Sequence, residues 1–221
     1  MGRPDGPDAT VDVAPERLDG WLSRFADSHG EVTWSVVDGP AASPWSWAAD
    51  AADGSWARLT SWCAPAGERA TGEWALPPAL LVLLVRRGGY AVAVAAPDGS
   101  LAAAKVGTRH VQSRTAAGGW SQQRYARRRA HQADALVEAV VGHAGRVLEE
   151  GEQGTGPVGG LVLGGDRTLA AQVLEAVATG PRARLHGIPR RELWDVADPR
   201  RSVLEEAVRR GRAARVTVHN A

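Results

Sequence analysis

Residues 79–106 read ALLVLLV-RRGG-YAVAVAA-PDGS-LAAAKV, three apolar runs separated by two short turns. Apolar runs of six or seven residues have the length of strands, and clusters of Gly, Pro and Asp favour turns. Because turns this short join antiparallel neighbours, the segment predicts a three-stranded antiparallel meander. Residues 109–114 are a candidate extension of its last strand.

A long helix is predicted after the meander. Apolar residues recur at three- and four-residue steps from Ala133 to Leu148, the pattern of a helix with one buried face. The helix is expected to run from Gln122 to about Glu150, on the order of 40 Å at 1.5 Å per residue. The glycine-rich residues 151–156 are expected to end it.

The remainder of the chain predicts alternating strands and helices. The expected strands are 158–163, 183–188 and 214–219, and the expected helices are 167–178 and 200–211. A meander followed by helix, strand, helix, strand, helix and strand implies an α/β (α+β) fold with one mixed sheet.

The first part of the chain is less regular. Residues 15–28 predict a helix with Pro15 at its start, and residues 32–37 predict a strand. Residues 41–74 lack clear periodicity but contain Trp45, Trp47, Trp56, Trp62 and Trp74, which are candidates for base stacking or, by the general behaviour of aromatics, for core packing. The expected organisation is a disordered lead-in over 1–14, an irregular segment over 15–75 (a small lobe or part of the same domain) and a principal domain over 76–221.

Composition excludes several classes of protein. Cys63 is the only cysteine, so no internal disulfide or cysteine-rich zinc site forms, and a reducing compartment is favoured. The first residues lack the apolar run of a signal peptide, and the longest apolar run is too short and too proline-interrupted to cross a bilayer. These features indicate a soluble cytoplasmic protein with no membrane partner, and no spacing indicates a metal or cofactor.

The charges are segregated although the net charge is only +1. Residues 99–133 contain no Asp or Glu, and their cations are Lys105, Arg109, Arg114, Arg124, Arg127, Arg128 and Arg129. Clustering of this kind is the footprint of a nucleic-acid contact. The alternative is a solvated arginine face. Lys105 is the only lysine, so the choice of arginine over lysine is general in this chain and carries no argument.

A glycine–glutamine segment precedes the basic residues. It runs Gly118-Gly119-Trp120-Ser121-Gln122-Gln123 and leads directly into the arginines. Paired glycines let the main chain approach another molecule closely. A glutamine is neither a general base nor a nucleophile at neutral pH, but its amide can orient a water and its backbone N–H can stabilise an oxyanion. The alternative is an ordinary loop before a helix, with Ser121 as its cap.

Residues 114–129 resemble the catalytic loop and following helix in the middle domain of archaeal and eukaryotic peptide-chain release factors. In those proteins a Gly-Gly-Gln tip precedes an aromatic-Ala-Arg sequence, which Tyr125-Ala126-Arg127 matches here. The run 158–166 resembles the strand and turn after that helix. In this chain Trp120-Ser121 separate the glycines from Gln122. That displacement is similar to the Vms-like release factor (VLRF) group of peptidyl-tRNA hydrolases, in its actinobacterial branch.

The resemblance implies a fold, an activity and a set of residues. It implies a ribonuclease-H-like mixed sheet with a long basic helix after a projecting glycine–glutamine loop. The implied activity is ribosome rescue, the hydrolysis of peptidyl-tRNA on the large ribosomal subunit without a stop codon, with ribosomal RNA and peptidyl-tRNA as partners. The implied catalytic residues are Gln122 or Gln123, with Gly118 and Gly119. The arginines at 109, 114, 124 and 127–129 would then contact RNA.

The sequence also suggests two alternative functions. A ribonuclease-H-like sheet suggests a metal-dependent nuclease, but Asp98, Asp134 and Asp166 are candidates by position only and occupy places where solvated aspartates are common. The histidines have no zinc spacing, and no Gly-x-Ser-x-Gly sequence is present. The stronger alternative is a non-enzymatic RNA- or ribosome-binding module that uses the arginine-rich helix without chemistry.

Overall fold

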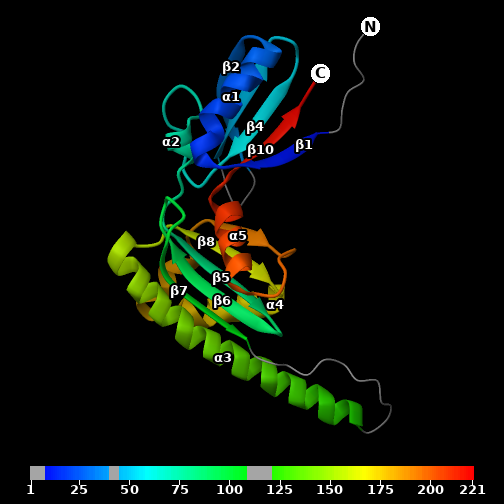
Figure 1. Ribbon diagram of the computed structural model, residues 1–221, viewed down its shortest axis with the longest axis vertical. Coiled ribbons are helices and arrows are strands. Elements are labelled where there is room, and N and C mark those ends of the chain that lie inside the picture. Colours follow the sequence, from blue (N-terminus) through cyan, green and yellow to red (C-terminus); the bar gives the residue numbers. More distant parts are fainter. Residues whose placement is uncertain (1–7, 40–44, 109–120) are drawn as a thin grey trace. The chain divides into compact units, whose positions relative to one another are not determined.

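The computed structural model describes residues 8–39, 45–108 and 121–221, with the backbone alone described at 45 and at 121–132. The chain divides into two compact units, which Figure 1 shows with their elements labelled. The terminal unit comprises Met1–Pro78 together with Arg209–Ala221, and the central unit is Ala79–Val208. Each unit has its own five-stranded sheet and its own apolar core.

The sheet of the central unit is mixed. Its strands are β5 (Leu80–Arg86), β6 (Gly89–Ala95), β7 (Leu101–Thr108), β8 (Gly160–Gly165) and β9 (Arg190–Leu193). Their order across the sheet is β7-β6-β5-β8-β9. The first three pair antiparallel, which confirms the predicted meander. β8 pairs in parallel with β5, and β9 pairs in parallel with β8. Residues 109–114, the candidate extension, lie outside the described residues.

The central strand β5 is buried on both faces, which explains why it is apolar at nearly every position. Its side chains Leu81, Leu83 and Val85 belong to a core cluster with residues of the helices α3 (Ser121–Thr155) and α4 (Arg167–Val177). Alternate side chains of β5 point to the opposite face, and they are fully buried as well. The predicted helix 167–178 is confirmed as α4, which covers part of the sheet face that carries Leu81, Leu83 and Val85.

A tight turn joins β8 to α4 and requires glycine. Gly165 has a φ of +93°, and a Cβ there would lie 2.3 Å from the carbonyl oxygen of Val85. Asp166 follows and caps α4, because its carboxylate accepts hydrogen bonds from the backbone N–H groups of Thr168 and Leu169 at 3.0 and 3.1 Å. The Gly-Gly-Asp sequence thus turns a buried strand directly into a helix.

The terminal unit holds a fully antiparallel sheet. Its elements are β1 (Ala9–Val13), α1 (Pro15–His29), β2 (Val32–Asp38), β3 (Trp45–Ala51), β4 (Trp56–Thr60), α2 (Gly72–Ala75) and β10 (Ala214–His219). The strand order is β1-β10-β4-β3-β2. The apolar face of α1 (Leu18, Leu22 and Phe25) is buried in one cluster with Trp47 and Leu59 of the sheet. The predicted helix 15–28 and strand 32–37 are confirmed.

Several predictions of the fold are wrong. The described residues form two sheets, not one, and the predicted strand 214–219 forms β10 in the terminal unit. Residues Ala9–Val13 of the expected lead-in form β1, which pairs along its full length with β10. Residues 183–188 lie mostly in the 3₁₀ helix η1 (Gly180–His186) and not in a strand. The last helix, α5 (Arg201–Arg212), matches its prediction.

Candidate functional site

The proposed catalytic segment lies at the start of α3. Gln122 and Gln123 occupy the first turn of this helix, which begins at Ser121 and extends for 35 residues. Gly118 and Gly119 lie outside the described residues, as do Arg109 and Arg114. The remaining predicted RNA-binding residues lie in the first turns of α3, where the structure describes the backbone alone. They are Arg124, Arg127, Arg128 and Arg129.

The first part of α3 extends beyond the sheet, whereas its second part lies against it (Figure 1). The helix is about 50 Å long at 1.5 Å per residue. The predicted buried stripe is confirmed, and its fully or nearly fully buried members are Leu136, Val140, Ala144, Val147 and Leu148. The sheet strands that α3 contacts are β6 and β7.

The C-terminal turns of α3 fit closely against β6. A Cβ on Gly151 would lie 2.3 Å from the Cβ of Val94, so glycine allows the helix axis to approach the strand. The helix therefore continues through Gly151 rather than ending there, and it ends at Thr155, before Gly156 with a φ of +74°. The prediction that glycine ends the helix is correct, but the predicted end lies about one turn before the observed one.

Charged pairs add to this attachment. Glu149 pairs with Arg182, and Glu152 pairs with Arg184. Glu152 also accepts a hydrogen bond from the backbone N–H of Val158 at 2.9 Å, and Arg184 donates one to the Val158 carbonyl at 2.9 Å. The acids at the C-terminal end of α3 are thus bonded to the segments that follow it, which fixes the direction of the helix at its anchored end.

A second group of cationic side chains lies where α3 crosses the edge of the sheet. Lys105 of β7 is exposed, and Arg146 of α3 is exposed and donates a hydrogen bond to Nδ1 of His143 at 2.8 Å. The His143 ring stacks on Tyr90 of β6, with centroids 5.3 Å apart and planes 19° apart. Burial, then Arg146 and Lys105, lower the pKa of His143 below its usual value. Sequence reasoning named Lys105 as one of the clustered cations but did not connect it with Arg146 or His143.

The carboxylates proposed for a metal nuclease serve other purposes. Asp98 accepts hydrogen bonds from the backbone N–H and the hydroxyl of Ser100 in the β6–β7 turn, and Asp166 caps α4. Asp134 is exposed on α3. Within the described ranges no three His, Cys, Asp or Glu side chains come close enough together to hold a metal ion. The structure does not bring these aspartates together as a site.

The tryptophans of the terminal unit mostly pack rather than present free faces. Trp47 and Trp74 are buried in the core, which confirms the packing interpretation for these two. Trp62 donates a hydrogen bond to the carbonyl of Gly211 at 2.8 Å. Trp56 stacks on His219 with centroids 5.6 Å apart, and the Arg58 guanidinium lies 4.9 Å from its centroid.

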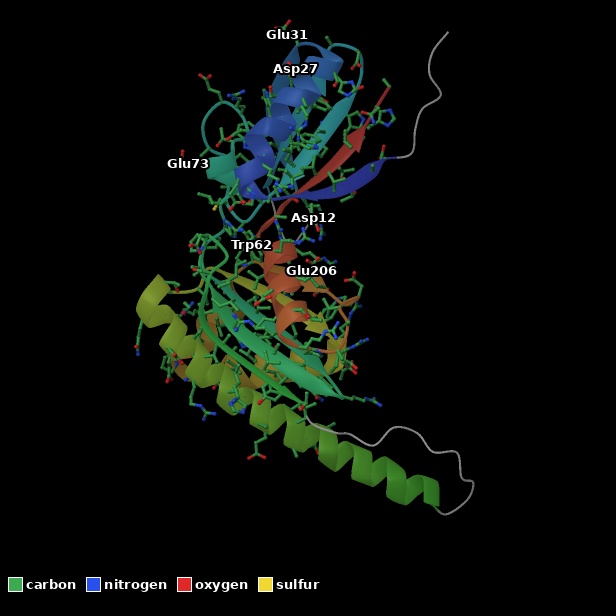
Figure 2. All side chains as sticks on the ribbon, viewed as in Figure 1. Asp12, Asp27, Glu31, Trp62, Glu73 and Glu206 are labelled. Carbon is green, nitrogen blue, oxygen red and sulfur yellow. The ribbon has the colours of Figure 1, made fainter. Side chains whose placement is uncertain are left out.

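The two units differ in charge. The terminal unit contains 12 acidic residues and 9 arginines, and the central unit contains 13 acidic residues and 17 basic ones. Figure 2 labels four acids of the terminal unit, Asp12, Asp27, Glu31 and Glu73, all of them exposed. The positive charge that a polyanionic partner would require is therefore concentrated in the central unit.

Comparison with known proteins identifies the family. No helix among the described residues has the length and apolarity to cross a membrane. None of the curated proteins compared with the chain matches it. The family model of the actinobacterial and chloroflexi VLRF1 release factor matches residues 78–217, which is more than half of the chain and includes all of α3. The chain therefore belongs to the VLRF1 release factor family, in its actinobacterial branch.

Proposed function

We propose that the protein is a ribosome-rescue peptidyl-tRNA hydrolase. It cleaves the ester between the nascent peptide and tRNA on the large ribosomal subunit, in the cytoplasm and independently of a stop codon. Its partners are peptidyl-tRNA and ribosomal RNA, and it requires no cofactor. Membership in a release-factor family over residues 78–217 is the observation that carries the proposal. We also infer that the mixed sheet of the central unit is of the ribonuclease-H-like type that the resemblance implies.

In this mechanism a glutamine positions the attacking water. Gln122, or else Gln123, uses its side-chain amide to orient the water toward the ester carbonyl. Neither residue transfers a proton. Gly118 and Gly119 let the main chain reach the ester without a side chain in the way. The position of both glutamines in the first turn of α3 supports this role, because backbone N–H groups there lack intrahelical acceptors and favour developing negative charge.

The arginines hold the helix on RNA. The first twelve residues of α3 contain four arginines and no acid, so phosphates are their expected partners. We assign RNA contacts to these four and to Arg109 and Arg114. Phosphate contacts fix the orientation of a protein on its nucleic acid, and here they would aim the glutamine-bearing end of the helix at the ester.

A release assay on ribosome-bound peptidyl-tRNA tests the proposal. Gln122→Ala is expected to abolish release of the nascent chain while ribosome binding is retained, and Gln123→Ala tests the neighbouring glutamine. Gln153→Ala is the matched control, because Gln153 is an exposed glutamine at the other end of the same helix. Release that persists in both Gln122→Ala and Gln123→Ala would show that the enzymatic assignment is wrong.

The second candidate function is a non-enzymatic ribosome-binding module. The observation that favours it is the concentration of arginines in the first turns of α3, which needs no chemistry to be useful. The same assay separates the two functions. A binding module retains salt-dependent ribosome binding and shows no release even in the wild-type protein.

A further inference from the structure

We propose that Lys105 and Arg146, together with His143, form a second RNA phosphate-binding site at the anchored part of α3. The site is separate from the arginines in the first turns of the helix. It takes the phosphate groups of an RNA backbone and does not read the bases. The proposal depends on the proposed function only for the identity of that RNA as ribosomal RNA or tRNA.

The geometry of the site is held by packing. The residues of β7 that face α3 include Ala103, which belongs to the core cluster, and Lys105 and Gly107 follow it on the same face. A Cβ on Gly107 would lie 2.5 Å from the ring of Tyr90, so glycine leaves space for that ring. Tyr90 in turn supports the ring of His143 by stacking.

The hydrogen bond to Arg146 defines the state of the histidine. A guanidinium only donates, so Nδ1 of His143 must accept, and the neutral ring therefore carries its proton on Nε2. Protonation of Nδ1 would break this hydrogen bond and place a third positive charge beside Arg146 and Lys105. The cluster thus holds two permanent cations and one N–H donor.

Neither cation is neutralised by an acid. Within the described residues, Lys105 and Arg146 form no ion pair with a carboxylate. Of the two acids in the turn after Arg146, Glu149 pairs with Arg182, and Glu150 forms no ion pair with any residue that the structure describes. Arg146 is hydrogen-bonded to His143, and Lys105 contributes to the lowered pKa of the same ring. Two exposed cations near one histidine, with no carboxylate paired to them among the described residues, have an anion as their expected partner.

The location of this site along α3 would allow it to orient the helix on RNA. Arg146 follows Arg129 by 17 residues, which is about 25 Å along the helix. A helix held on RNA only by its first turns could rotate about that contact. A second phosphate contact about 25 Å away fixes the angle of the helix, and therefore the position of the glutamines at its end.

The first test uses His143 as a reporter within the site. The imidazole is titrated by NMR in the full chain, alone and with a short RNA duplex. Phosphate beside Lys105 and Arg146 offsets their charge, so the pKa of His143 is expected to rise when RNA is added. An unchanged pKa would overturn the proposal. Polyglutamate serves as the second probe, and an equal rise with this carboxylate polymer would overturn it in favour of an acidic protein partner.

The second test measures the salt dependence of ribosome binding. The double variant Lys105→Gln, Arg146→Gln is expected to lower the slope of log K against log salt by about 1.4 to 1.8, at about 0.7–0.9 per phosphate contact. The matched control is Arg87→Gln, Arg190→Gln, which removes the same charge from two exposed arginines elsewhere in the unit, one in the β5–β6 turn and one at the start of β9. An equal loss in both double variants would overturn the proposal, because it would reflect net charge alone.

Two further readouts separate this proposal from folding defects and from the proposed function. Thermal unfolding of the double variant at pH 7.5 is expected to match wild type, since both side chains are exposed. RNA binding is measured without peptidyl-tRNA, so a protein that never releases peptide can still show the His143 response. Conversely, a protein that releases peptide but shows no response retains the proposed function and lacks this site.

Discussion

The two parts of α3 share one helix but have opposite chemistry. Residues 121–132 contain four arginines and no acid, whereas residues 133–155 contain five acids and only one arginine, Arg146. The second part carries the buried stripe and the ion pairs with Arg182 and Arg184. The first part extends past the sheet (Figure 1).

This difference teaches that stability and function are assigned to separate stretches of one element. The second part anchors the helix through apolar burial and through Glu149 and Glu152, which pair with Arg182 and Arg184. The first part carries charges suited to an external partner. Substitutions in the first part should therefore alter binding with little effect on folding. Substitutions of the buried or ion-paired residues of the second part should do the reverse, whereas Arg146 belongs with the binding residues.

The largest expected effect concerns the first part. Replacing Arg124, Arg127, Arg128 and Arg129 with Gln should lower the salt slope of ribosome binding by about 3 to 4, at about 0.7–0.9 per phosphate contact. Because Gln has a helix propensity close to that of Arg, and exposed substitutions are usually worth within about 0.5 kcal/mol, stability should hardly change. Binding at several salt concentrations and chemical unfolding measure the two quantities. An unchanged slope would indicate a solvated face.

The next effect concerns the second part. Gly151→Ala places a Cβ against Val94 and should destabilise the protein by about 1–3 kcal/mol, because the overpacked methyl outweighs the gain of about 1 kcal/mol in helix propensity. Gly142→Ala is the control on the same helix, since no atom lies within 4 Å of its added Cβ. It should stabilise by up to about 1 kcal/mol. Unfolding in denaturant measures both, and the same sign for the two variants would contradict the close packing of α3 on β6.

The elements predictable from the sequence are those with strong local patterns. The meander, the buried stripe of α3 and the helices α4 and α5 all show apolar periodicity with clear turn residues. The strand β9 was missed because its sequence, Arg-Arg-Glu-Leu, holds only one buried residue, Leu193. Residues 183–188 suggested a strand, but Arg182 and Arg184 bond to acids of α3, and the segment forms a 3₁₀ helix.

Two of the four strand pairings in the sheet of the terminal unit were not predictable because they are non-local. β10 lies at the end of the chain and pairs with β1 and β4, more than 150 residues earlier. β3 is rich in Ala and Trp and does not alternate clearly, because Ser46 and Ala48 are buried although they lie on the face opposite Trp47. The position of the candidate site in the sequence was predictable. The grouping of Lys105, His143 and Arg146 was not, because it depends on how α3 crosses β7.

The smallest effect tests the one place where the second part of α3 carries an unneutralised cation. Burial, Arg146 and Lys105 lower the pKa of His143 in the folded protein. Just below the usual histidine pKa of 6.5, the unfolded chain therefore binds more protons at this residue than the folded chain does. Stability from this residue is therefore present above about pH 6.5 and decreases as pH falls through that value. The lowered pKa values of Glu16 and Asp53 act in a more acidic range, below about pH 4.5.

Thermal unfolding at pH 7.5 and 5.5 should show a smaller pH dependence in His143→Gln than in wild type. In Lys105→Gln, Arg146→Gln the dependence should shrink without vanishing, because burial is the largest cause. An unchanged dependence in His143→Gln would mean that the histidine is not held neutral against these two cations.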